Sequence, residues 1–274
     1  MKAVILAAGY GTRLQRDVRA DCSGRHAHLS GLAKPLLPVG SRALISHWVH
    51  ALTAAACVDA VYVVTNALYR AAFEDWATQF SNVKIVSDGT TTNEGRLGAV
   101  ACLQLAVTHF QIEDDVMAIG GDTLFKEDFS LTRVTERFRE LQAERADVCL
   151  VLSYQCQEEE TRKYGILEVD GDLRVRCMKE KPLPSETTSR RACPCFYAFS
   201  KKSLPLLDVF LEEKKNSPIE EKDAPGIFVS WIISRTPVYV YPISGRFDVG
   251  NLPSYIECDR YFTEKLQNFQ LYMV

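Results

Sequence analysis

The stretch that decides the fold is Val4-Ile5-Leu6-Ala7-Ala8-Gly9-Tyr10-Gly11-Thr12-Arg13-Leu14, close to the start of the chain. Its first residues are apolar and partly β-branched, which predicts a buried strand, and its glycines break that strand into a loop that leads to a helix. At the carboxyl end of a parallel strand, glycines let backbone N–H groups approach an oxyanion, and the helix start adds the positive end of its dipole. The segment therefore predicts an α/β fold with a phosphate-bearing ligand at this loop.

Two common phosphate motifs do not match this loop. The dinucleotide fingerprint requires a third glycine where this chain has Leu14. The P-loop requires Gly-Lys followed by Ser or Thr where this chain has Gly11-Thr12-Arg13. Taken by itself, the loop is also compatible with a tight strand-to-helix turn that binds nothing.

Short apolar, β-branched runs alternate with segments of helical period from residue 1 to about 155. The runs cover residues 4–6, 61–64, 83–86, 116–119 and 148–152. Between them, two apolar stripes at helical spacing consist of Leu44, Ile45, Trp48, Val49 and Leu52, and of Leu131, Val134, Phe138 and Leu141. This alternation predicts a parallel sheet with helices on both faces.

The pattern changes after residue 155. Strand-like runs at 164–169 and 173–178 are joined by Asp170-Gly171, a dipeptide that favours a two-residue type I′ turn with Val169 opposite Asp172. A Pro-, Ser- and Thr-rich loop follows at 182–189, and a helical segment begins at Pro253. We expect a smaller α+β portion that packs on the first and places Tyr164 and Glu180-Lys181 at the same end of the hairpin.

Composition narrows the class of protein. The chain has 274 residues, of which 47% are hydrophobic and 24% charged, and a net charge of −3. These values predict a globular protein that binds neither nucleic acid nor membrane surfaces. Nine scattered cysteines, an odd number, indicate reduced thiols, and Cys193 and Cys195 lack the partners of a zinc site. No stretch approaches the ~20 apolar residues that would span a bilayer, and the expected compartment is the cytoplasm.

Two aspartates follow predicted strands. Asp122 ends the segment Ile119-Gly120-Gly121-Asp122, and Asp248 follows the run 238–243. Asp122 by itself also fits a turn. If the two carboxylates converged, they would bind Mg²⁺, a hard cation that takes oxygen ligands and keeps waters beside substrate phosphates.

Two longer motifs occur in the order typical of one family. Leu6-Ala7-Ala8-Gly9-x-Gly11-Thr12-Arg13-Leu14 and Lys34-Pro35-Leu36-Leu37-Pro38-Val39 together resemble the signature of the sugar-1-phosphate nucleotidyltransferases, which make nucleoside diphosphate sugars. Gly121-Asp122, Tyr164-Gly165, Glu180-Lys181-Pro182 and Asp248-x-Gly250 resemble further motifs of that family, so the resemblance spans roughly residues 2–260.

The resemblance implies a fold and a reaction. The fold is a Rossmann-like three-layer α/β/α arrangement with a mixed, mainly parallel sheet and no C-terminal β-helix. Residues 1–274 would form a single catalytic domain, with a nucleotide-binding half at 1–155 and a sugar-phosphate-binding half at 156–274. The substrates would be an NTP and a sugar 1-phosphate, Mg²⁺ the cofactor, and an NDP-sugar and pyrophosphate the products. Assembly into a homo-oligomer stays open.

The resemblance also assigns roles to residues. It implies that Arg13, Lys34, Asp122, Lys181 and Asp248 are catalytic, and that Asp122 and Asp248 are the metal ligands. It implies that the sugar phosphate is bound by Tyr164, Gly165, Glu180, Lys181 and Tyr197. Nucleotide contacts would come from Leu6, Ala7, Ala8, Gly9, Gly11, Thr12, Arg13, Lys34, Asn93, Gly98 and Gly121.

Three segments depart from the family pattern. Residues 15–28 form an insert that is either a basic lid over the phosphates or a mobile surface loop, and we favour the loop. Residues 88–98 lack the glutamine-proline pattern of thymidylyltransferases, so the base is unassigned. Cys195 replaces a glycine of many relatives, which puts close backbone approach to the sugar in question.

Two rival functions remain compatible with the sequence. One is a cytidylyltransferase for a non-sugar phosphate such as phosphocholine, whose quaternary amine requires an aromatic cage. Tyr164, Phe196, Tyr197 and Trp231 could supply its rings. The other is a non-catalytic nucleotide-sugar-binding regulatory protein, which would not need the metal ligands or the substrate lysine.

Overall fold

The computed structural model describes residues 1–126 and 128–271, and the side chains among them as far as Lys265. Its strands are β1 (Lys2–Leu6), β2 (Pro38–Val39), β3 (Arg42–Ala43), β4 (Val61–Thr65), β5 (Val83–Ser87), β6 (Val116–Gly120), β7 (Thr123–Phe125), β8 (Cys149–Gln155), β9 (Gly165–Val169), β10 (Val175–Glu180), β11 (Arg191–Cys193), β12 (Phe196–Phe199), β13 (Val238–Pro242) and β14 (Arg246–Asp248). Its α-helices are α1 (Thr12–Ala20), α2 (Leu44–Ala54), α3 (Arg70–Ala77), α4 (Ala99–His109), α5 (Leu131–Glu144), α6 (Leu206–Glu213), α7 (Pro225–Ile232) and α8 (Leu252–Leu271).

One large sheet organises the molecule, in the order β10-β9-β11-β8-β12-β6-β1-β4-β5, and β13 pairs with β8. The strands β6, β1, β4 and β5 are parallel, as the alternating pattern predicted. β12 comes from the second half of the chain and lies antiparallel between β6 and β8. The prediction of a mixed sheet with a parallel core is confirmed, and the sheet runs through both halves of the chain.

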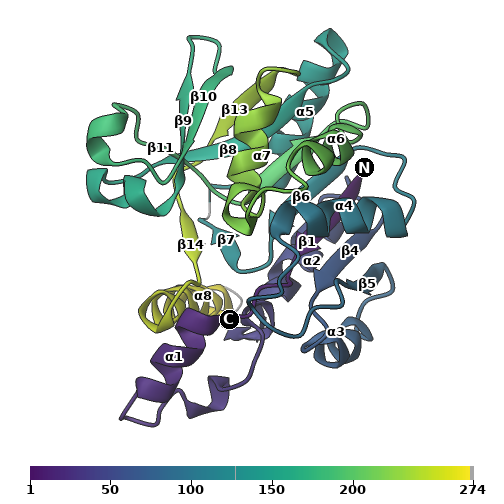
Figure 1. Cartoon of the computed structure of the whole chain (residues 1–274). Helices are drawn as coiled ribbons and strands as arrows, with labels where there is room; N and C mark the ends of the chain where they lie inside the picture. The colour runs from purple at the N-terminus through teal and green to yellow at the C-terminus, as the bar shows by residue number, and fades with distance from the viewer. Residues whose placement is uncertain (127, 272–274) are drawn as a thin grey trace.

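Helices cover both faces of this sheet, so that the molecule has three layers (Figure 1). Successive residues of a strand point to opposite faces. Accordingly, Ala3 and Ile5 pack in one core with α2, α3, α5 and α8, while Val4 packs in the other with α4, α6 and α7. Every residue of the two predicted helical stripes is buried, which confirms both stripes as core.

The hairpin between β9 and β10 differs from the predicted two-residue turn. Val169 pairs with Val175, not with Asp172, and five residues connect the strands. The Asp170 carboxylate accepts hydrogen bonds from the N–H groups of Asp172 and Arg174, both at 3.0 Å, and thereby stabilises the longer connection. The expectation for the other end is confirmed, since Gly165 pairs directly with Glu180.

The insert at 15–28 is not a simple loop, so that expectation was wrong for its first part. Residues as far as Ala20 continue α1. The Gln15 amide, which is buried, donates to the carbonyls of Leu29 and Leu32 and accepts from the N–H of Gly31. These bonds hold the residues that directly follow the insert against the first turn of α1.

No helix in the described part of the chain is both long enough and apolar enough to cross a membrane.

Candidate functional site

The glycine loop between β1 and α1 forms one wall of the site. Gly11 has φ +63° and precedes the first residue of α1, a conformation that glycine adopts without strain. A Cβ at Gly11 would lie 3.3 Å from Cγ of Lys34, so the glycine also lets that lysine pass. The N–H groups of Ala8, Gly9, Tyr10 and Gly11 donate to no backbone carbonyl within the residues described. The loop therefore presents free donors to an anion.

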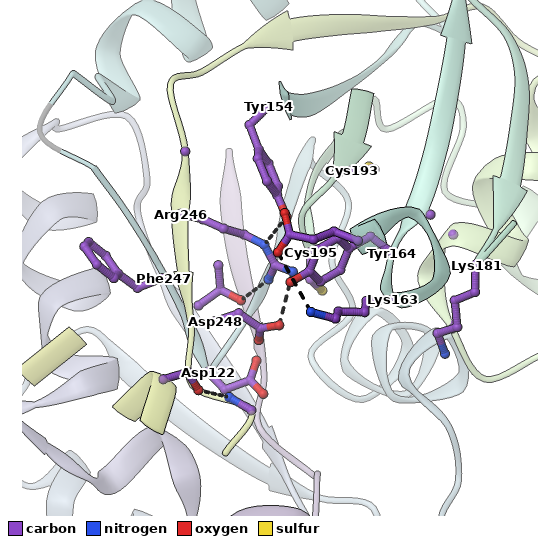
Figure 2. A pocket seen from close by; sticks show the side chains of 18 of the residues that line it. Asp122, Tyr154, Lys163, Tyr164, Lys181, Cys193, Cys195, Arg246, Phe247 and Asp248 are labelled. Carbon is purple, nitrogen blue, oxygen red and sulfur yellow. Dashed lines mark hydrogen bonds and ion pairs between the residues drawn. The ribbon is translucent and has the colours of Figure 1, made fainter. Parts of the chain in front are cut away.

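Asp122 and Asp248 lie on the same cavity, whose volume is about 950 Å³. Asp122 directly precedes β7, and Asp248 ends β14. The two strands pair antiparallel with Asp248 opposite Thr123, and the N–H of Val249 donates to the Asp122 carbonyl at 3.0 Å. Figure 2 shows both side chains pointing toward the same space. The convergence that the sequence analysis required is present.

Each of these carboxylates has a cationic partner. The Lys34 ammonium lies 3.1 Å from Oδ2 of Asp122, and the Arg246 guanidinium lies 3.2 Å from Oδ2 of Asp248. Burial raises the pKa of the Asp248 carboxyl, and the negative charge of Asp122 adds to this, while Arg246, Lys34 and Arg13 oppose it. A cation bound between the two carboxylates would stabilise the ionised form of Asp248, whose pKa burial and the charge of Asp122 raise.

The donor set fits Mg²⁺. No group of three or more His, Cys, Asp or Glu side chains comes together within the described residues. A protein zinc site needs three or four such ligands. Mg²⁺ is typically bound by one or two carboxylates together with substrate phosphates and waters. Asp122 and Asp248 can supply the carboxylates, and the N–H groups of the loop can hold the phosphates.

The sugar-side motifs meet on the far side of this cavity. Gly165 pairs with Glu180, and the N–H of Lys181 donates to the carbonyl of Tyr164 at 3.1 Å. A Cβ at Gly226, near the start of α7, would lie 2.5 Å from Oε2 of Glu180. The Glu180 carboxylate thus occupies space that the glycine leaves open. Burial raises its pKa, and the neighbouring Lys181 opposes the shift.

Lys181 reaches the cavity from an unusual backbone conformation. Its φ of +52° lies in the left-handed region, which costs a non-glycine residue about 1–3 kcal/mol. The ammonium lies 3.6 Å from Oε1 of Glu180 and is well exposed. Figure 2 shows it across the cavity from Asp122 and Asp248. The acceptor-side cation and the two aspartates therefore face one space from opposite walls.

The segment around Cys195 lies close to β6, at Gly120. The Cys195 carbonyl accepts from the N–H of Gly120 at 2.7 Å, and a Cβ at Gly120 would lie 2.9 Å from Cβ of Cys195. The glycine that allows this close contact is therefore Gly120 on β6, and not the residue after Pro194. Burial raises the pKa of the Cys195 thiol to about 12. Tyr197, on β12, is buried and also lines the cavity.

Arg246 is a site residue that the sequence reasoning missed. Its side chain is only 8% exposed. Besides Asp248, its guanidinium contacts the Tyr154 hydroxyl at 3.1 Å and Oγ1 of Thr123 at 3.4 Å, and it lies 4.7 Å from the centre of the Tyr164 ring. The sequence did contain a signal for Arg246. It lies two positions before Asp248 on the same strand, and residues two apart on a strand point to the same face.

A second cavity, of about 260 Å³, adjoins the glycine loop. Leu6, Ala8, Gly9 and Gly98 line it together with Asp122 and Cys195. Asn93, which the resemblance grouped with Gly98, instead lines a separate cavity of about 620 Å³ that also borders Tyr10 and Thr12. Asp88, which directly follows β5, lines the cavity with Gly98 and was not among the residues assigned from the sequence.

The four rings that could have caged a quaternary amine do not gather. Phe196 packs beside Trp48 in one core, whereas Tyr197 belongs to the opposite core. Trp231 stacks under Arg235, whose guanidinium carbon is 3.6 Å from the ring centre. Of the four, Tyr164 already faces the guanidinium of Arg246. An aromatic cage of these residues is absent.

Comparisons with known proteins find a matching family model and named relatives. The family model described as "Nucleotidyl transferase" matches residues 2–265. A Sulfolobus acidocaldarius protein named as a mannose-1-phosphate guanyltransferase is 25% identical over 253 residues, which cover 91% of this chain and 60% of that protein. A Streptomyces griseus protein named glucose-1-phosphate thymidylyltransferase is 27% identical over 274 residues, which cover 96% of this chain and 66% of that protein.

Solved structures share the fold. The apo form of a UDP-glucose pyrophosphorylase superimposes with a TM-score of 0.74 at 17% identity, and the match covers 97% of this chain and 99% of that one. This chain spans about 60 to 66% of the length of the two curated relatives.

Proposed function

Since this chain belongs to the nucleotidyl transferase family, we propose that it transfers a nucleoside monophosphate from an NTP to a sugar 1-phosphate, with Mg²⁺, and releases pyrophosphate. The observation that carries the proposal is the shared cavity, in which Asp122 and Asp248 face Glu180 and Lys181. An enzyme that joins two phosphates requires one cavity in which the negative charges of both phosphates are neutralised.

The triphosphate side of the reaction falls to the glycine loop. Its free N–H groups, near the start of α1, bind the phosphates. Arg13 lines the same cavity as the aspartates, and Lys34 lies beside Asp122. Both cations balance the charge that accumulates on the departing pyrophosphate.

Asp122 and Asp248 are the residues that would hold Mg²⁺. When bound, the ion neutralises charge on the phosphate under attack and thereby favours the approach of a second anion. Lys34 and Arg246 orient the two carboxylates through ion pairs of 3.1 and 3.2 Å, and they limit the repulsion between these carboxylates before the ion binds.

The acceptor side uses Lys181 and Glu180. Lys181 holds the phosphate of the incoming sugar phosphate, where two anions would otherwise repel, and Glu180 accepts hydrogen bonds from sugar hydroxyls. The attacking phosphate oxygen is already ionised at neutral pH, so no general base is required. Catalysis then consists of in-line positioning and charge neutralisation.

A substrate matrix tests the proposal. The purified protein is incubated with each of ATP, GTP, CTP, UTP and dTTP against a panel of sugar 1-phosphates and phosphocholine, with Mg²⁺, and pyrophosphate release is measured. We expect release with one sugar 1-phosphate and none with phosphocholine, because Tyr164, Phe196, Tyr197 and Trp231 do not form a cage for a quaternary amine. Nucleotide binding without product in any pairing would refute the transferase and support the regulatory protein.

A further inference from the structure

The second cavity indicates which nucleobase the site selects, an inference that rests on the proposed function. This cavity lies between the glycine loop, the start of α4 and Asp122. Its volume of about 260 Å³ is too small for a nucleoside triphosphate and suits one planar base whose phosphates continue toward Gly9 and Asp122. The groups along its walls therefore face the edge of the base.

Two charged residues of the wall, Arg96 and Asp223, bond to each other and to the backbone. The Asp223 carboxylate accepts from the N–H of Ala99 at 2.9 Å and from Nε of Arg96 at 2.8 Å. Nη1 of Arg96 donates to the carbonyl of Asn93 at 3.2 Å. These bonds hold the Asp223 carboxylate and the Arg96 guanidinium in place.

The Asp88 carboxylate differs from that of Asp223 in the hydrogen bonds of one of its oxygens. Its Oδ1 accepts from both the N–H and the hydroxyl of Thr90, each at 2.8 Å. Within the described part of the chain, its Oδ2 contacts only the Cys102 thiol, at 3.9 Å, a weak donor whose pKa is raised by burial and by the nearby charges of Asp88 and Asp223. Oδ2 of Asp88 is thus a strong acceptor on the cavity wall, held in position through the other oxygen of the same carboxylate.

From this we infer that the base is guanine, read by the carboxylate of Asp88. A carboxylate accepts and does not donate. Guanine alone among the common bases presents two adjacent donors, N1–H and the 2-amino group, to a single carboxylate. Uracil and thymine present one N–H between two carbonyl oxygens that would repel Asp88, while adenine and cytosine pair one amino group with an acceptor nitrogen.

Calorimetric binding of nucleotides to the intact chain tests the inference without turnover. GTP is compared with ITP, which lacks only the 2-amino group, and with ATP, CTP, UTP and dTTP. A hydrogen bond to a charged group makes a difference of about 10- to 150-fold, so GTP should bind more tightly than ITP by at least about tenfold. Equal binding of GTP and ITP, or tighter binding of a pyrimidine nucleotide, would overturn the inference.

The variant Asp88→Asn supplies a second arm. The amide keeps one oxygen for Thr90 and turns the free position into a donor, which suits the C2 carbonyl of xanthine. We expect this variant to bind XTP more tightly than GTP, with Asp172→Asn, in the distant hairpin connection, keeping the wild-type preference. An unchanged preference for GTP in a folded Asp88→Asn protein would also overturn the inference.

The two proposals fail in different ways. Pyrophosphate release with a pyrimidine nucleotide and a sugar 1-phosphate would leave the transferase standing and refute guanine. Preferential binding of GTP without release, for any acceptor, would refute the transferase and leave the assignment of the base intact.

Discussion

Replacing Gly226 with alanine should weaken binding of the acceptor and leave binding of the nucleotide unchanged. The new Cβ would lie 2.5 Å from Oε2 of Glu180 and 2.7 Å from Cε of Met178. Both atoms are ends of flexible side chains, so they move and the backbone of α7 remains. The Glu180 carboxylate then leaves the position from which it faces the acceptor side of the cavity.

The structure allows two magnitudes to be estimated. Overpacking costs about 1–3 kcal/mol, and alanine in place of glycine within a helix returns about 1 kcal/mol. The free energy of unfolding should therefore fall by no more than about 2 kcal/mol. Loss of hydrogen bonds to the charged Glu180 removes about 1.5–3 kcal/mol of acceptor binding, which raises the acceptor KM by about 10- to 150-fold.

Steady-state pyrophosphate release, with each substrate varied in turn, gives the two KM values, and calorimetric unfolding gives the stability. We expect a raised KM for the sugar 1-phosphate and an unchanged KM for the NTP. Gly171→Ala is the matched control, because a Cβ there meets no atom within 4 Å. A folded Gly226→Ala protein whose acceptor KM equals that of the control would refute the role given to Glu180.

Other parts of the site lead to further predictions. Arg246→Met should lower the free energy of unfolding in urea by about 1–3 kcal/mol, because the half-buried Asp248 carboxylate and the Tyr154 hydroxyl lose a hydrogen-bond donor, and an unchanged stability would contradict this. Asp122→Asn and Lys181→Ala should keep the wild-type Tm and lose about 10²- to 10³-fold in kcat, whereas near-normal turnover in either variant would mean that its role is misassigned. Because the pKa of the Cys195 thiol is raised to about 12, the thiolate fraction there falls tenfold for each pH unit below that value, to roughly 10⁻⁴ at pH 8. Mass spectrometry after limited alkylation at pH 8 should therefore find exposed Cys22 modified well before Cys195, and equal rates would contradict the shift.

Much of the fold follows from local pattern. The apolar run before Gly9 and the stripes of α2 and α5 have the period of the element that they form, and that period determines which side chains are buried. The conformation of the glycine loop could also be predicted, because backbone conformation there depends on the glycines themselves. The hairpin turn was predicted wrongly because the side chain of Asp170 accepts hydrogen bonds beyond the dipeptide considered.

The candidate site depended on contacts between residues far apart in the chain. The pairing of β7 with β14 brings Asp248 to Asp122, and the docking of α7 places Gly226 against Glu180. The sequence motif suggested Asn93 for the base, and the cavity contains Asp88 instead.

The sequence by itself determined the residue types and most of the elements, because each depends on neighbours within a few positions. Only the tertiary structure decided that Asp122 and Asp248 share a cavity and that Arg246 meets Thr123. Those outcomes depend on strand pairing and side-chain packing across more than 100 residues of chain, which no local pattern specifies.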